Sequence, residues 1–163
     1  MPPQGGVSVL SESADVNPSL KSYAEKLLAA ANWHGVAMVE FRIAPDGTPY
    51  LMEVNTRFWG SLQLAIDSGV DFPALMVSNE LNLGIPNPAS YKIGQRLRWL
   101  LGDVDSLYLY LKGNYSVRQK IQRMVEFIIP NLSKTKHEIN RLNDIKPAFY
   151  ELKVYMRQIL GKE

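Results

Sequence analysis

Three side chains that carry oxygen ligands, Glu40, Glu53 and Asn55, lie on two β-prone segments separated by a turn signal. The turn signal is Asp46-Gly47, and Asp-Gly between two such segments is typical of a β-hairpin. If these two residues are the central residues of the turn, Glu40 faces Glu53 on the neighbouring strand. Residues two apart on a strand point to the same side, so Asn55 lies beside Glu53. The spacing therefore predicts a sheet face with two carboxylates and an amide oxygen.

Two carboxylates in this arrangement repel each other. Directly opposed residues have Cβ atoms about 4.5–5.5 Å apart, and two charges about 5 Å apart repel by roughly 3 kcal/mol at an effective dielectric of about 20. A shared proton, a neighbouring arginine or a bound cation would offset this repulsion. Arg42, which the same register places opposite Leu51, and Arg57 are the nearby arginines. An alternative interpretation is thus that both glutamates are ordinary surface residues balanced by these arginines.

The ligand types favour a bound cation, and magnesium in particular. Carboxylate and amide oxygens suit a hard cation such as Mg²⁺, which keeps several positions for water and phosphate. The chain has no Cys and only two His, so we do not expect a zinc site. Apolar residues occur at both parities of the two strands, which predicts a covered sheet rather than an exposed one.

The hairpin sequence resembles a known family. Val39-Glu40-Phe41, the turn, and then the segment from Leu51 to Ser61, which reads LMEVNTRFWGS, are similar to the metal-binding end of ATP-grasp enzymes. The resemblance is to the carboxylate-amine ligase-like branch, whose relatives include D-alanine:D-alanine ligase. It covers about residues 5–84 and corresponds to the carboxy-terminal portion of that fold.

The resemblance implies roles for individual residues. Glu40, Glu53 and Asn55 would hold Mg²⁺ (or Mn²⁺) that bridges the phosphates of ATP, and Arg57 would be the catalytic and cofactor-binding residue at the phosphate or acyl-phosphate end. In such enzymes a small carboxylate substrate is activated as an acyl phosphate, which an amine or thiol then attacks. This chemistry requires positioning and charge neutralisation rather than a protein nucleophile.

The same resemblance implies that further domains take part. ATP-grasp enzymes carry an N-terminal domain and a lid domain before the metal-binding hairpin, whereas only 34 residues precede Gly35 here. We therefore expect the chain to be a C-terminal fragment that acts with missing N-terminal and lid domains of the same enzyme. By itself it should be catalytically incomplete and inactive, because binding energy and orientation carry most of the rate.

The expected fold class is α+β, an antiparallel sheet covered by helices with a helical C-terminal extension. A short strand at residues 5–12 could edge the hairpin sheet. Further patterns predict helices over residues 17–31, 61–69 and 71–84, and a strand over residues 91–101. Arg96 and Arg98 share one face of that strand, where they reach an anionic substrate or, more simply, are solvated at a sheet edge.

Two further positions admit two interpretations each. The turn at Gly60-Ser61 either contacts a phosphate or substrate carboxylate through its N–H groups, or is a tight turn with Ser61 as the N-cap of the next helix. His34 follows the first predicted helix. Packing or helix end-capping is its expected role, with catalysis as the alternative.

The last third of the chain differs in charge. Residues 112–163 contain 11 Lys and Arg against 5 Asp and Glu, whereas residues 1–111 contain 7 against 11. Apolar stripes predict amphipathic helices near residues 117–128 and from Pro147 to Ile159 with basic outer faces. We therefore predict two domains, a C-terminal ATP-grasp subdomain at 1–111 and a basic helical extension at 112–163.

The basic helices provide the alternative function, a non-catalytic module for interaction or oligomerisation, and a homo-oligomer is one form of it. No nucleic-acid-binding motif accompanies the basic residues, and no apolar run approaches the roughly 20 residues of a membrane span. We expect neither nucleic-acid nor membrane binding. The first residues do not form a signal peptide, so a cytoplasmic location is expected.

Overall fold

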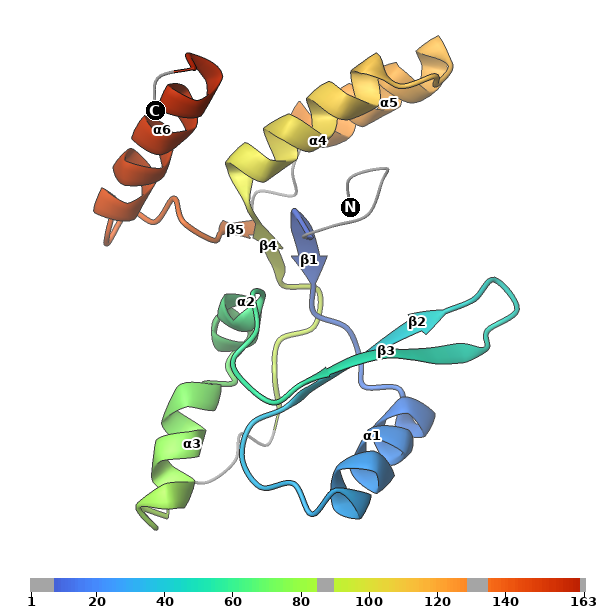
Figure 1. Cartoon of the computed structure of the whole chain (residues 1–163), viewed down its shortest axis with the longest axis vertical. Helices are drawn as coiled ribbons and strands as arrows, with labels where there is room; N and C mark the ends of the chain where they lie inside the picture. The colour runs from blue at the N-terminus through green and yellow to red at the C-terminus, as the bar shows by residue number, and fades with distance from the viewer. Residues whose placement is uncertain (1–7, 85–89, 129–134, 162–163) are drawn as a thin grey trace. The chain divides into compact units, whose positions relative to one another are not determined.

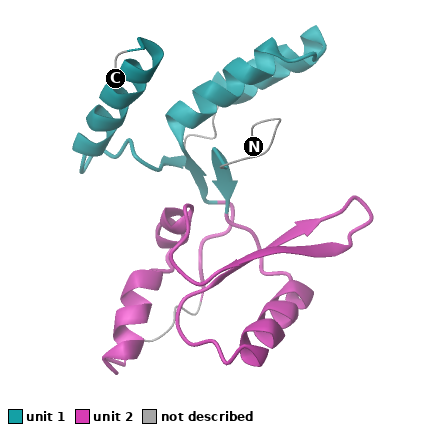
Figure 2. Cartoon of the chain, in the orientation of Figure 1, with its two compact units in different colours: residues 1–12, 95–163 teal, residues 13–94 magenta. Residues whose placement is uncertain are grey.

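The computed structural model describes residues 8–84, 90–128 and 135–161. The chain divides into two compact units, shown in different colours in Figure 2. Unit 1 contains Met1–Glu12 and Gln95–Glu163, and unit 2 contains Ser13–Gly94. The predicted division into domains at 1–111 and 112–163 stays a prediction.

Over its described residues, unit 2 consists of a β-hairpin and three helices (Figure 1). Its elements are α1 (Pro18–Ala30), β2 (Met38–Ile43), β3 (Pro49–Asn55), α2 (Leu62–Ser68) and α3 (Phe72–Glu80). The two strands pair only with each other among the described residues. All four predicted site residues lie on or directly after this hairpin.

The described part of unit 1 contains a second, mixed sheet and three helices. Its elements are β1 (Leu10–Glu12), β4 (Arg96–Arg98), α4 (Leu100–Lys112), α5 (Val117–Ile128), β5 (Thr135–His137) and α6 (Lys146–Ile159). β4 is the central strand, antiparallel to β1 and parallel to β5. The predicted α+β fold class is confirmed.

Local sequence signals explain where the helices of unit 2 begin. The Asn17 side chain accepts hydrogen bonds from the N–H groups of Ser19 and Leu20, and Pro18 stands at the first helical position of α1. The Asp71 side chain caps α3 by accepting from the N–H of Ala74 at 2.9 Å. Each cap satisfies N–H groups that have no partner inside the helix.

The hairpin forms as predicted, but with a different turn. The Gly47 N–H donates to the Ala44 carbonyl and the Ala44 N–H donates to the Thr48 carbonyl, both at 2.9 Å, so the loop has three residues rather than two. Gly47 has φ +87°, which a side chain would disfavour. The Thr48 N–H also donates to the Asp46 carboxylate, and this bond lowers the pKa of Asp46.

A β-bulge compensates for the extra loop residue. Arg42 pairs with Tyr50 instead of the predicted Leu51, but the register shifts after Phe41 so that Glu40 pairs with Glu53. Met52 is the additional residue on β3, and such an insertion restores the predicted pairing beyond it. The predicted pairing of the two glutamates is therefore confirmed, although the loop length and the register near the turn differ from the prediction.

Two predictions for the other strands were wrong, and a further strand was not predicted. The segment predicted as a strand over residues 91–101 is a strand only at β4, and α4 starts directly after it. The N-terminal strand, whose predicted part up to residue 7 lies outside the described residues, pairs with β4 and not with the hairpin. β5, which the sequence pattern did not indicate, completes this second sheet.

The arginines of β4 are structural. Arg98 is only 5% exposed and donates to the Asp103 carboxylate at 2.7 Å, while its guanidinium lies 4.4 Å from the centre of the Phe127 ring. Arg123 pairs with the other oxygen of Asp103, and Arg96 pairs with Glu12 at 2.6 Å. Neither β4 arginine lies on an edge strand, and each is paired with a carboxylate, Arg98 with Asp103 in the first turn of α4 and Arg96 with Glu12 on β1.

Few apolar side chains are fully shielded from solvent. Among the described residues, the buried apolar ones are Val9, Leu97 and Ala148. The predicted C-terminal helices are present as α5 and α6, and apolar side chains of α5 remain exposed at Val117, Ile121, Val125 and Ile128. In the described part of the chain, none of the helices combines the length and apolarity needed to cross a membrane.

Candidate metal and phosphate site

Glu40 and Glu53 occupy directly paired positions on β2 and β3. Paired residues of antiparallel strands project from the same face of the sheet, so the two carboxylates are neighbours. Both side chains are exposed to solvent. The pair is therefore accessible to an ion or a polyphosphate from solution.

Asn55 completes the same face. It pairs with Met38 on β2, and its Nδ2 donates to Oε1 of Glu53 at 2.5 Å. Rotation of the amide exchanges Nδ2 and Oδ1, so the position next to the Glu53 carboxylate can offer an oxygen instead. The three predicted ligand residues are thus brought together.

Arg57 lies just beyond the end of β3, two residues after Asn55. Its Nη1 donates to the carbonyl of the next residue, Phe58, at 2.9 Å. The side chain is exposed, and it forms no salt bridge with the glutamates. A guanidinium that is not committed to a carboxylate retains donors for a phosphate.

The surroundings differ from the predicted covered sheet. Large apolar side chains of the hairpin are exposed at Ile43, Tyr50, Leu51, Met52 and Val54, with exposed fractions of 37–57%. Arg42 does not balance the glutamates either. In the described ranges, neither glutamate has a Lys or Arg nitrogen within 4.0 Å.

The donor set fits a hard divalent cation. It consists of two carboxylates and one amide, which are open to water on the exposed side and have no ion-pair partner among the residues that the structure describes. Mg²⁺ commonly binds through one or two carboxylates plus waters and phosphates. Over residues 8–84, 90–128 and 135–161, no group of three or more His, Cys, Asp or Glu side chains is positioned to hold a metal. Asn55 is therefore essential to a three-ligand site in the hairpin.

The segment after the hairpin is a turn that leads into α2, and no side chain caps the start of that helix. Ser61 occupies the N-cap position of α2 but makes no capping hydrogen bond, whereas Gly69 ends the helix in the left-handed conformation. Trp59 packs edge-on against Phe72 with ring centres 5.1 Å apart. Ser61 is the N-cap residue of α2 as predicted, although its side chain does not supply the capping hydrogen bond.

His34 was expected to pack or to cap a helix end, and it does neither. Its side chain is 73% exposed, and its Nε2 lies 3.1 Å from Oε1 of Glu80. The partner is 46 residues away in the sequence. No local sequence pattern indicates this pair. It forms because α3 packs near residue 34.

Comparison with known proteins identifies the family. Residues 4–102 match the family model described as ATP-grasp in the biosynthetic pathway with Ter operon, and this range includes Glu40, Glu53, Asn55 and Arg57. No curated protein and no solved structure matches the chain significantly. Because the match spans more than half of the 163 residues, the chain belongs to the ATP-grasp family of ATP-binding ligases.

Proposed function

We propose that the hairpin of this ATP-grasp protein binds the phosphates of Mg²⁺-ATP (or Mn²⁺-ATP) for the activation of a small carboxylate. The observation that carries the proposal is the direct pairing of Glu40 with Glu53, with Asn55 beside them. Bound there, the cation would neutralise phosphate charge and orient the triphosphate. These three residues would hold it, with water and phosphate oxygens as the remaining ligands.

Arg57 is the residue that we assign to the transferred phosphoryl group. It lies two positions beyond Asn55, and its guanidinium is exposed. A guanidinium presents five N–H donors in a planar arrangement that matches phosphate oxygens. Its role would be to bind charge that develops on the phosphoryl oxygens, and it neither donates nor accepts a proton.

The proposed reaction has two steps. In the first, a carboxylate oxygen of the substrate attacks the γ-phosphorus of ATP, the bond to the β-phosphate oxygen breaks, and ADP leaves. In the second, an amine or thiol attacks the acyl carbon, phosphate leaves, and the nucleophile loses a proton. Both steps depend on positioning and electrostatic stabilisation, and neither requires a nucleophilic side chain from the protein.

Metal titration tests the ligand assignment. We expect Glu40→Gln and Glu53→Gln each to weaken Mn²⁺ binding in the presence of ATP by about tenfold or more, measured by electron paramagnetic resonance of free Mn²⁺. Glu25→Gln is the matched control, because Glu25 is an exposed carboxylate on α1 outside the hairpin. Unchanged Mn²⁺ affinity in both hairpin variants would contradict the proposal.

A second pair of variants separates phosphate binding from metal binding. Arg57→Ala should weaken ATP binding while leaving Mn²⁺ binding without nucleotide unchanged, because the guanidinium is not a metal ligand. Arg42→Ala is the control, since Arg42 is also an exposed arginine of the hairpin but lies towards the turn. Equal effects of the two substitutions on ATP affinity would remove the role assigned to Arg57.

A further inference from the structure

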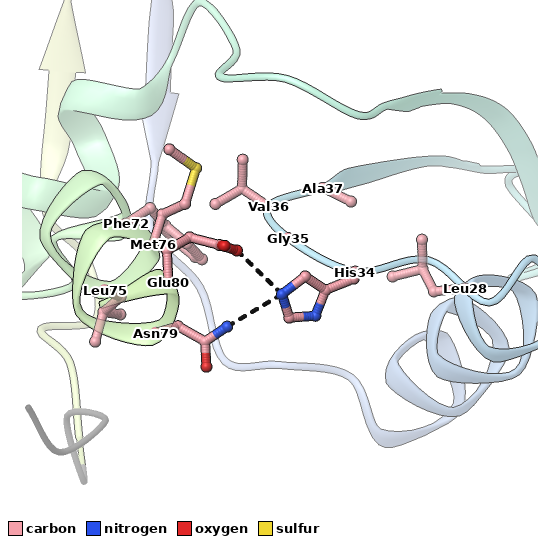
Figure 3. A pocket seen from close by; sticks show the side chains of 10 residues that line it. All are labelled: Leu28, His34, Gly35, Val36, Ala37, Phe72, Leu75, Met76, Asn79 and Glu80. Carbon is pink, nitrogen blue, oxygen red and sulfur yellow. Dashed lines mark hydrogen bonds and ion pairs between the residues drawn. The ribbon is translucent and has the colours of Figure 1, made fainter. Parts of the chain in front are cut away.

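A recess in unit 2 is lined by none of Glu40, Glu53, Asn55 and Arg57. It has a volume of about 470 Å³, within the range of small-molecule sites, and Figure 3 shows its lining. Its polar groups are His34, Asn79 and Glu80, which we call the polar triad. Its apolar lining comes from α1, from the segment before β2 and from α3, through Leu28, Val36, Ala37, Phe72, Leu75 and Met76.

The three side chains of the polar triad contact one another. His34 Nε2 lies 3.1 Å from Glu80 Oε1 and 3.4 Å from Asn79 Nδ2, as the dashed lines in Figure 3 mark. The Glu80 carboxylate is an acceptor only, so His34 Nε2–H is the donor in their contact, while further lone pairs of that carboxylate and the Asn79 amide oxygen can accept from a ligand. The N–H donors of a primary ammonium group match these two acceptors.

The charge of the recess has the sign that an ammonium group requires. Glu80 carries the formal negative charge, and neither Lys nor Arg is among the residues that line the recess. A transition metal is a poorer match, because one imidazole, one carboxylate and one amide form a weak ligand set. A bare metal ion would also leave the apolar lining without a role.

The apolar lining specifies the rest of the ligand. The six apolar residues are half-buried, whereas the polar triad is exposed, so the recess has a hydrophobic interior and a polar rim. A zwitterionic amino acid would bring its carboxylate towards Glu80, which disfavours it electrostatically. The matching ligand has one ammonium group and an uncharged apolar substituent.

We propose that this recess binds a small primary ammonium compound with an apolar substituent. The ammonium group donates to the Glu80 carboxylate and the Asn79 amide oxygen, beside His34, and the substituent contacts the interior formed by residues such as Phe72 and Leu75. The site is independent of the hairpin and of nucleotide.

Calorimetric titration of the full chain tests this proposal without ATP or metal. The probes are 2-phenylethylammonium chloride and its uncharged analogue 2-phenylethanol. We expect the ammonium compound to bind at least tenfold more tightly than the alcohol. Glu80→Gln should lower the affinity for the ammonium compound at least tenfold. Glu25→Gln, a change in an exposed carboxylate of α1 outside the recess, should leave the affinity unchanged.

Spectroscopy supplies a second measurement. Glu80 and His34 are exposed, so Glu80→Gln and His34→Ala should retain the wild-type circular dichroism spectrum. Addition of the ammonium compound should shift the His34 ring resonances in the wild-type protein, and much less in the Glu80→Gln variant. No binding, equal affinity for amine and alcohol, or an unaffected Glu80→Gln variant would each overturn the proposal.

An ammonium group could also come from a lysine side chain of a protein. Nα-acetyl-lysine amide, which presents that side chain without terminal charges, is the third probe. Weaker binding of this probe than of 2-phenylethylammonium supports a small apolar amine as the ligand. Tighter binding would overturn that assignment.

Discussion

Neutralising Glu40 or Glu53 should stabilise the metal-free protein. The two carboxylates are paired across the hairpin and have no basic partner among the described residues, so they repel each other. Because both side chains are exposed, the dielectric constant of water, about 80, applies better than the value of about 20 that suits a covered sheet. Two charges about 5 Å apart then repel by about 0.8 kcal/mol.

A double-mutant cycle measures this repulsion directly. Glu40→Gln and Glu53→Gln should each raise the free energy of unfolding by about 0.8 kcal/mol in metal-free buffer of low ionic strength, measured by urea denaturation. The double variant should gain no more than either single variant, because one substitution already removes the repulsion. The pair Glu25→Gln and Glu53→Gln is the control, and its effects should add.

A divalent cation should reverse the order of stability. At about ten times its dissociation constant, Mn²⁺ would stabilise the wild-type protein by about 1.4 kcal/mol, which exceeds the repulsion. The wild-type protein should then be more stable than either Gln variant, whose gain from Mn²⁺ is smaller. Additive effects of Glu40→Gln and Glu53→Gln without metal, or an unchanged order with Mn²⁺, would refute the reasoning.

Three further predictions concern unit 1. Asp103→Asn should destabilise the protein by about 3–5 kcal/mol in urea denaturation, because it leaves two arginine side chains without their buried carboxylate partner. Gly102→Ala should cost about 1–3 kcal/mol in the same assay, because the added Cβ would lie 2.2 Å from the Trp99 ring. A hydrogen bond to Asp105 raises the pKa of Tyr155 to about 12. Its stabilising contribution should be complete below pH 10 and lost as the pH rises through 12, so ultraviolet titration should show one late phenol that Tyr155→Phe removes.

Sequence reasoning succeeded where a local signal determines local structure. Asn17-Pro18 predicted the start of α1, and Asp46-Gly47 predicted the hairpin. The predicted pairing of Glu40 with Glu53 was correct, but the turn assumed for it was not. The loop is one residue longer than assumed, and the bulge at Met52, which no local signal indicates, compensates for it.

Sequence reasoning failed where contacts between distant segments decide. Arg96 and Arg98 alternate with apolar residues as in an edge strand, but β1 and β5 flank β4 on both sides. α4 has a detectable signal, since Leu100, Val104, Leu107 and Leu111 recur at helical spacing, but the alternation before it suggested a longer strand. The contact between His34 and Glu80 joins residues 46 positions apart and has no signal in either segment.

The exposure of the glutamate pair also limits what the hairpin can do without nucleotide. Mg²⁺ gives up its hydration water reluctantly, and two carboxylates in contact with water attract it much less than buried ones would. Phosphate oxygens add ligands and negative charge at the same point, so cation and ATP should each increase the affinity for the other by the same factor. A solvent-exposed carboxylate pair thus suits a site whose cation arrives with the triphosphate rather than one that holds a permanent ion.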